Sequence, residues 1–176
     1  DTESTFLSTL NQVLFGVIEP AKKRQLLTAE EIQLLSQLSV DVIIKASVTL
    51  IKHLQQALDG YRKDSASHLC VGDVFCSVMT EDVIAAFIKY SSYYTKVSQW
   101  LTTLEKPENK DHPLRPLLRK KQRENKGETI KAQLITGVQR PPRYSLLLRV
   151  CHKSGTKFVF IFLPTGLTKE DKSFAP

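Results

Sequence analysis

The chain has few of the residues that mark turn-rich, disulfide-linked or membrane-spanning proteins. Its 176 residues include only seven glycines and three cysteines. Few glycines beside long leucine-rich stretches favour helices over a turn-dense β protein. The odd number of cysteines, without regular spacing, indicates free thiols in a reducing compartment. The longest apolar run, residues 158–163, is far shorter than the roughly 20 residues that span a bilayer.

Signatures of covalent catalysis, metal binding and phosphate binding are also missing from the sequence. The four histidines are far apart, and no His-x-x-x-His or Cys-x-x-Cys pair occurs. There is no Gly-x-Ser-x-Gly motif and no glycine-rich phosphate loop. Paired carboxylates such as Glu30-Glu31 precede apolar helical stretches, where they favour the positive end of the helix dipole. We therefore expect no metal, no cofactor and no covalent chemistry, and a function based on binding.

The overall composition is that of one globular domain with a basic surface. Hydrophobic residues make up 41% and charged residues 24% of the chain, and the net charge is +7. Such a charge fits an acidic partner protein, a membrane surface or nucleic acid, and equally a solvated basic face. No secretory leader is evident, so we expect a soluble, cytoplasmic protein, with recruitment to a membrane surface as a further option.

Apolar residues at helical spacing predict helices along most of the chain. A capping box at Thr28–Glu31 starts a short helix, and Thr129 starts the helix that ends near Gly155. The composition of residues 105–116 indicates a connector, and a charged run follows it. The sequence therefore predicts an all-α, elongated bundle of roughly five or six main helices with an irregular C-terminal tail. The other predicted helices are Phe6–Val17, ended by Pro20; Asp41–Leu58, ended by Gly60; a short one from Val71; and Thr80–Leu104.

One stretch of the last predicted helix is unusual. It reads LITGVQRPPRYSLLLRV, residues 134–150, and places two prolines inside the helical pattern. A proline in a helix interior costs about 3 kcal/mol or more, because it lacks the N–H group and its ring clashes with the preceding turn.

This stretch resembles the third conserved region of the Dbl-homology (DH) domain, the helical module of exchange factors for Rho-family GTPases. The family pattern is Val-Gln-Arg-Ile-Pro-Arg-Tyr-Pro-Leu-Leu-Leu-Lys. Two weaker matches occur in the expected order: Thr2–Leu10 is similar to the first conserved region, Thr-Glu-x-x-Tyr-Val-x-x-Leu, and Gly72–Phe75 to the start of the central region. The residues that match the third region are Gln139, Arg140, Pro142, Arg143, Tyr144, Leu146, Leu147, Leu148 and the basic Arg149.

The resemblance implies an activity that makes or breaks no bond. A GTPase holds its nucleotide through two mobile switch loops. An exchange factor prefers the nucleotide-free arrangement, so it shifts the population toward nucleotide release. The implied partner is a Rho-family small GTPase, in Rho signalling to the actin cytoskeleton.

The motif match also gives roles to particular residues. Glu3 corresponds to the family's glutamate that engages switch I. Gln139 and Arg140 either contact the GTPase or satisfy the bent helix, and the three residues Leu146, Leu147 and Val150 are expected in the core. The positions that correspond to contacts with switch II are Leu134, Arg143, Ser145 and Arg149.

The sequence departs from the family pattern at three places. Thr136-Gly137 replaces a common Lys-Pro pair, Ser145 replaces a frequent proline, and the family's long final helix has no counterpart in residues 156–176. We divide the chain into a DH domain, residues 1–155, and an atypical tail, residues 156–176. Within the tail we expect Phe158–Leu163 to form a strand or a buried apolar strip. We expect weakened exchange activity.

Two other functions stay open. The first is a non-catalytic helical scaffold that binds a GTPase or another protein. The second is binding of phosphoinositides or nucleic acid by the basic run Arg115–Lys126. Because that run has no interleaved aromatics and includes Glu124, a solvated helix face is the better interpretation of it, and we expect no nucleic-acid partner.

Overall fold

The computed structural model describes residues 2–63 and 71–153, with side chains as far as residue 149, and these residues are helical almost throughout. No strand occurs in these two ranges, and the predicted all-α bundle is confirmed. The predicted apolar strip Phe158–Leu163 and the helix end at Gly155 lie outside the described residues. The elements are α1 (Thr2–Val13), the π-helix η1 (Leu14–Ile18), α2 (Glu19–Lys23), α3 (Ala29–Ser36), α4 (Val40–Lys63), α5 (Val71–Val78), α6 (Glu81–Glu105), the 3-10 helix η2 (Pro107–Asn109), α7 (Arg115–Glu124) and α8 (Ile130–Lys153).

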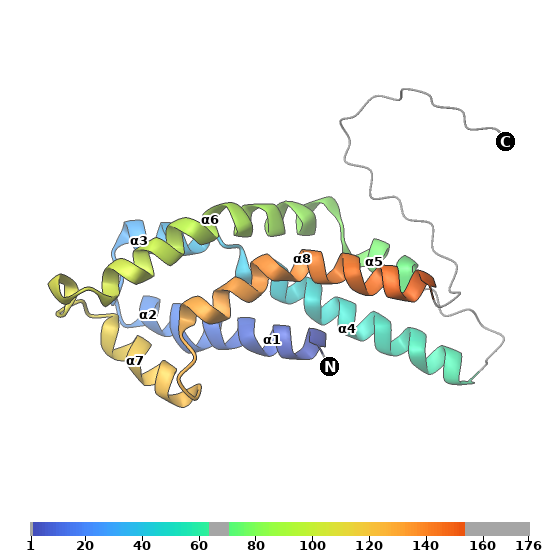
Figure 1. Cartoon of the computed structure of the whole chain (residues 1–176), viewed down its shortest axis with the longest axis horizontal. Helices are drawn as coiled ribbons and strands as arrows, with labels where there is room; N and C mark the ends of the chain where they lie inside the picture. The colour runs from blue at the N-terminus through green and yellow to red at the C-terminus, as the bar shows by residue number, and fades with distance from the viewer. Residues whose placement is uncertain (1, 64–70, 154–176) are drawn as a thin grey trace, which may run out of the picture.

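The long helices run roughly along the long axis of the bundle (Figure 1). Helix α8 packs against both α6 and α1, and α4 packs against α1, α5 and α6. The stretch of α3 and α4, residues 29–63, is long and apolar enough by composition to cross a membrane. In the bundle its apolar stripe, which includes Ile43 and Leu50, is buried against the neighbouring helices. It is therefore a core segment here.

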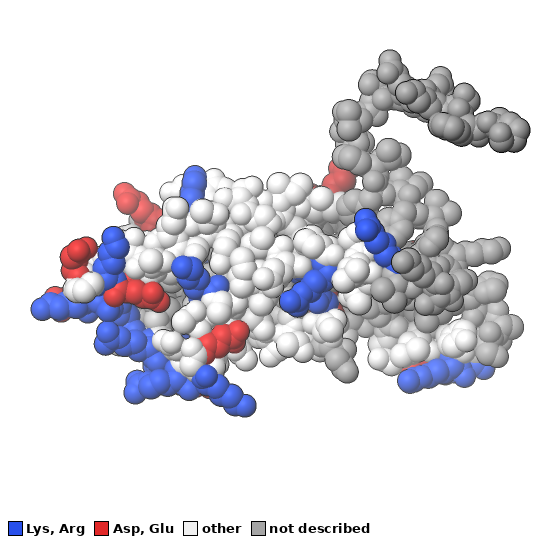
Figure 2. Space-filling view, in the orientation of Figure 1, with Lys and Arg blue, Asp and Glu red and all other residues white. Residues whose placement is uncertain are grey.

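Basic side chains are unevenly distributed over the face of the bundle shown in Figure 2. Lys and Arg side chains gather at the end formed by α7 and the outer end of α6 (Figure 2). Glu124 neutralises part of this charge, because its carboxylate lies 2.7 Å from Lys121 Nζ and 3.8 Å from Lys120 Nζ. The opposite end holds α5, the C-terminal part of α4 and the C-terminal half of α8 (Figure 1).

Helix starts follow the sequence signals closely where a side chain can cap the backbone. The capping box is confirmed: Glu31 N–H donates to Thr28 Oγ1 (3.2 Å), and Thr28 N–H donates to Glu31 Oε2 (2.9 Å). Thr129 also caps as predicted, since Ala132 N–H donates to its hydroxyl oxygen (3.1 Å). The predicted helix end at Gly60 is wrong, because α4 continues to Lys63.

Pro20 does not end the first helix, contrary to the sequence prediction. The chain widens into the π-helix η1, where Glu19 N–H bonds to the carbonyl of Leu14, five residues back. This change of register places Pro20 in the first turn of α2. A first-turn proline needs no N–H partner and already has the helical φ angle, so the helical path continues.

One apolar core runs through the bundle. Its most deeply buried large side chains include Leu10, Leu38, Ile43 and Tyr90, each with no exposed surface or nearly none. Ile88, an apolar residue of α6, is 63% exposed. The buried stripe of α6 passes through Phe87 and Tyr90, and this phase turns Ile88 outward.

Candidate functional site

The buried stripe of α8 decides which of its residues face solvent. Arg140, Tyr144 and Leu148 are buried, and their spacing of four residues places them on one side of the helix. The opposite side exposes the basic residues Arg143 and Arg149 together with the apolar Leu146. The exposed residues of this part of α8 are Gln139, Pro142, Arg143, Ser145, Leu146, Leu147 and Arg149.

Glu3 in α1 binds two of the buried residues of α8. Arg140 Nε donates a 2.9 Å hydrogen bond to Glu3 Oε2, and Arg140 Nη2 contacts the same oxygen. The Tyr144 hydroxyl donates to Glu3 Oε1 at 2.8 Å. Only 8% of Glu3 and 3% of Arg140 is exposed. These three residues, called the Glu3 cluster below, hold the first turn of α1 against α8.

Aromatic rings enclose the charges of the Glu3 cluster. The Arg140 guanidinium carbon lies 5.3 Å from the centre of the Phe6 ring and 4.7 Å from that of Tyr144, within the range of cation–π attraction. Burial, and next the nearby Glu3 carboxylate, raise the pKa of the Tyr144 hydroxyl. Tyr144 therefore stays protonated at neutral pH and remains a hydrogen-bond donor to Glu3.

The other predicted site residues lie at different places around α8. Gln139 and Arg143 are neighbours on the exposed face, with Arg143 Nη2 3.4 Å from Gln139 Oε1. Ser145 and Arg149 face the side of α5 and α6, where they line a groove. The structure thus places Glu3 against Arg140 and leaves the other polar residues predicted for the site at the surface: Gln139, Arg143, Ser145 and Arg149.

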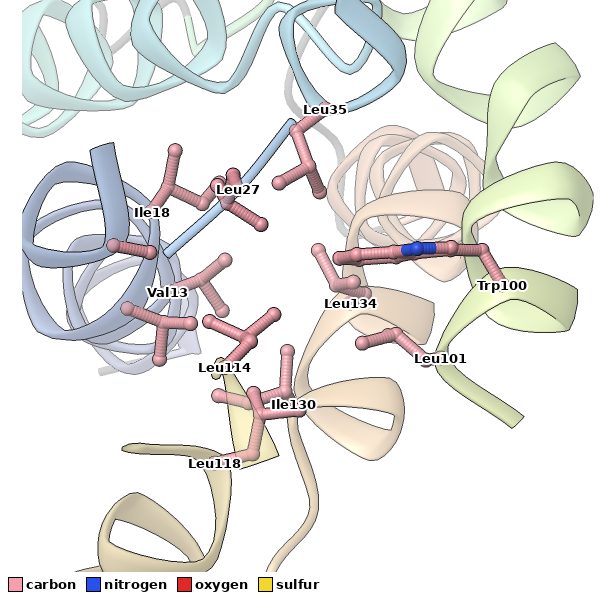
Figure 3. Close-up of a pocket in the computed structure, with 12 residues that line it drawn as sticks. Val13, Ile18, Leu27, Leu35, Trp100, Leu101, Leu114, Leu118, Ile130 and Leu134 are labelled. Carbon is pink, nitrogen blue, oxygen red and sulfur yellow. The ribbon is translucent and has the colours of Figure 1, made fainter. Parts of the chain in front are cut away.

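Leu134 is in the core, where it offers no surface to a partner. Only 1% of it is exposed. In Figure 3 its side chain lies among apolar side chains from α1, α3, α6 and α7, including Val13, Leu35 and Leu118. The contact role that the resemblance gives to Leu134 does not fit this burial.

The expectation that Leu146 and Leu147 fill the core is wrong. Leu146 is 63% exposed and Leu147 is 44% exposed, because the buried stripe through Tyr144 and Leu148 turns both outward. The side chain of Val150 lies outside the described residues. Two exposed leucines on the motif helix are candidate contact residues that sequence reasoning missed. The spacing of Arg140, Tyr144 and Leu148 was the signal that could have identified them.

Gly137 allows α6 to approach α8 closely. The Tyr90 hydroxyl donates a 2.7 Å hydrogen bond to the carbonyl of Leu134. A Cβ atom on Gly137 would lie 2.5 Å from Cζ of the same ring. Burial raises the pKa of Tyr90, so its hydroxyl stays protonated. The glycine that replaces the family's frequent proline is therefore required by the tyrosine opposite it.

No group of three or more His, Cys, Asp or Glu residues that could hold a metal ion occurs within the described parts of the chain. What these residues offer is a surface of arginine, glutamine and leucine side chains on α8, supported from beneath by the Glu3 cluster.

A sequence model of the RhoGEF domain matches residues 1–157 of the 176-residue chain. The chain belongs to the RhoGEF family. No curated protein and no solved structure matches the chain. The activity of this family is guanine-nucleotide exchange on Rho-family small GTPases, which requires no covalent chemistry. Both motif regions that meet in the Glu3 cluster lie inside the matched residues.

Proposed function

We propose that this RhoGEF domain binds a Rho-family GTPase through the exposed face of α8 and the adjacent start of α1, and accelerates GDP release. The observation that carries the proposal is the Glu3 cluster. It joins the first and third family motifs, which are 137 residues apart at Glu3 and Arg140. The domain would act in the cytoplasm; membrane contact through the basic run of α7 stays a prediction.

The exposed face of α8 has the composition of a protein-binding surface. Leu146 supplies apolar area at its centre, and Arg143 and Arg149 supply charge at its rim. Arginine is enriched among the residues that dominate binding energies. A basic rim also attracts an acidic partner surface and raises the association rate. Affinity for the nucleotide-free form is what would drive release of GDP.

The contacts that Glu3 makes with the described residues leave room for one further donor. A carboxylate offers about four lone-pair positions. Arg140 occupies two positions on Oε2, and Tyr144 occupies one on Oε1. The side chain keeps 10% of its surface exposed. We therefore propose that a donor from switch I adds to Oε1 without displacing Arg140 or Tyr144.

Release of fluorescent GDP from a panel of Rho-, Rac- and Cdc-type GTPases tests the proposal. The double variant Arg143→Ala/Leu146→Ala removes exposed side chains from α8. We expect it to slow release by about tenfold or more, as for a loss of at least 1.4 kcal/mol at a binding surface. The matched control is Arg123→Ala, an exposed arginine on α7 at the other end of the bundle. Equal rates for the double variant and the unchanged protein would refute the proposed surface.

A non-catalytic scaffold is the second candidate, and the internal use of Glu3 favours it. Because Arg140 and Tyr144 already bind this carboxylate, a switch loop gains less from it than from a free carboxylate. A scaffold would bind nucleotide-free GTPase in a pull-down without accelerating GDP release. An exchange factor would do both.

A further inference from the structure

An apolar groove of about 760 Å³ lies between α5, α6 and α8. Its volume falls within the range of pockets that enclose a drug-sized ligand, about 300–1,000 Å³. Ile88 stands on its wall with 63% of its surface exposed. The apolar residues that line it are Phe75, Met79, Ile84, Phe87, Ile88, Pro141 and Leu148. A hollow of this size, lined mostly by apolar side chains, is typical of a surface that another segment covers.

Tyr144 connects this groove to the Glu3 cluster. Its ring meets Phe75 edge-on at 5.0 Å between ring centres and Phe87 at 6.2 Å. These aromatic rings line the groove together. The hydroxyl at the other end of Tyr144 holds Glu3. Any segment that occupies the groove would therefore contact a residue that positions the first turn of α1.

The sequence contains an apolar segment of matching character directly after the family domain. Residues 158–163 read FVFIFL, with three phenylalanines and no charge. The RhoGEF match ends at residue 157. These six residues therefore lie outside the matched residues, and their composition suits burial against aromatic and aliphatic side chains.

The segment is also attached at the right place. Arg149 lines the groove and precedes the end of α8 at Lys153 by four residues, about 6 Å along a helix. Residues 154–157, Ser-Gly-Thr-Lys, then precede the apolar segment. Four residues span up to about 13 Å, and glycine and serine are suited to a reversal of the chain. The short connection gives the segment a high effective concentration at the groove.

We propose that residues 158–163 fold back and occupy the groove between α5, α6 and α8 of the same chain. The rim of the groove includes Ser145 and Arg149, two of the residues given to the GTPase by the family resemblance. Docking of the segment then shields these two residues from a partner, a consequence that rests on the proposed function. The docking itself does not depend on that function.

The single methionine of the chain, Met79, reports directly on the groove. Labelling the full chain with [methyl-¹³C]methionine gives one protein resonance. We expect this resonance to move when Phe158, Phe160 and Phe162 are all replaced by Ser, and to return toward its original position when a peptide of residues 156–165 is added. The control is Phe15→Ser, an exposed phenylalanine at a different surface. An unchanged Met79 resonance in the triple variant would overturn the proposal.

Limited proteolysis tests the same docking from the groove side. Ile88→Glu places a charge on the groove wall and spares the core, because Ile88 is largely exposed. Cleavage by chymotrypsin within residues 158–163, identified by mass, should become about tenfold faster, because cleavage follows the undocked population. Val48→Glu, an exposed residue of α4, should leave the rate unchanged. Equal rates in all three proteins would contradict the proposal.

Two further outcomes would indicate that a molecule other than this chain's own residues 158–163 occupies the groove. A Met79 resonance that moves on dilution would indicate the segment of a second copy. A resonance that is the same in the triple variant but moves when nucleotide-free GTPase is added would indicate that the GTPase occupies the groove. Each would overturn intramolecular docking. Because neither the resonance of the free chain nor its proteolysis requires exchange activity, failure of the proposed function would leave the docking result standing.

Discussion

The Tyr90 ring packs so close to Gly137 that there is no space for a Cβ atom at position 137. A Cβ at position 137 would lie 2.5 Å from Cζ and 2.9 Å from the hydroxyl oxygen of Tyr90. The same hydroxyl bonds to the Leu134 carbonyl one turn earlier. Tyr90 is fully buried, so its ring has little freedom to move aside.

Gly137→Ala should therefore destabilise the fold, although alanine is the better helix former. Overpacking of a well-packed core costs about 1–3 kcal/mol. Gly60→Ala is the control, because nothing lies within 4 Å of a Cβ placed there. That change should stabilise the fold by about 0.5–1 kcal/mol. Urea unfolding followed by circular dichroism gives both values, and a Gly137→Ala variant as stable as the original would contradict the close packing.

Breaking the Glu3 cluster from one side should cost more than removing both charges. Arg140→Met leaves Glu3 buried without its main partner, which costs about 3–5 kcal/mol. Adding Glu3→Gln should recover part of this loss, with a coupling energy of about 0.5–3 kcal/mol in a double-mutant cycle. Arg143→Met, at an exposed position of the same helix, should change stability by no more than about 0.5 kcal/mol. Strictly additive losses would show that the pair is not coupled.

The phase of α8 predicts different results for two leucines of the motif that are two residues apart, Leu146 and Leu148. Leu148→Ala removes a side chain that is 6% exposed and should cost about 2–5 kcal/mol. Leu146→Ala removes one that is 63% exposed and should change the free energy of unfolding by less than about 0.5 kcal/mol. Chemical unfolding of the two variants side by side decides the phase. If Leu146→Ala were the costlier change, the helix would face the other way.

Glu31 should make stability depend on pH in the acid range. Burial alone would raise its pKa, but hydrogen bonds from the Thr28 N–H and Trp100, and the nearby His112, lower it below the ordinary value of 4.5. Trp100 Nε1 lies 2.9 Å and His112 Nε2 3.1 Å from Glu31 Oε1. A carboxylate whose pKa is lowered by folding stabilises the fold above its ordinary pKa, and this stability is lost as the pH falls through the lowered value.

Glu31→Gln should accordingly be less stable near neutral pH by about 1 kcal/mol, because glutamine keeps an acceptor oxygen but lacks the charge that strengthens the hydrogen bonds to a carboxylate. This difference in the free energy of unfolding should shrink as the pH falls below 4.5, because the glutamate of the unchanged protein then becomes protonated and loses its charge. The single tryptophan of the chain is Trp100, so its fluorescence follows thermal unfolding at each pH. Glu30→Gln, an exposed neighbour, is the control and should give a smaller deficit. A deficit that stayed constant with pH would exclude the carboxylate as its source.

Local signals in the sequence predicted most of the helices but not their orientation. The capping box at Thr28 and the start of α8 at Thr129 depend on neighbouring residues, and both are confirmed. The resemblance indicated the family, which the RhoGEF match confirms. Three consecutive leucines mark no single face, so only the four-residue spacing of Arg140, Tyr144 and Leu148 could have indicated that Leu146 is exposed.

The pairing of Glu3 with Arg140 had no local signal either. Glu3 was assigned from its motif to a partner protein, and Arg140 either to the partner or to the bent helix. Only the packing of α1 against α8 shows that they bind each other. Pro20 gave a misleading signal for a related reason. A π-helical turn avoids the missing hydrogen bond and the steric clash that a proline causes in a regular helix, and no pattern in the sequence indicates such a turn.

The pairing of α1 with α8 also affects the order in which the protein folds. Among the described helices α1 is synthesised first, and it is held by residues of α8, which is synthesised last. Throughout synthesis the apolar face of α1 thus lacks part of its final partner. Contacts this distant in sequence form slowly, since the chain loses the entropy of closing a long loop before the contacts stabilise it. Exposed apolar surface in that interval is a target for chaperones and a risk for aggregation.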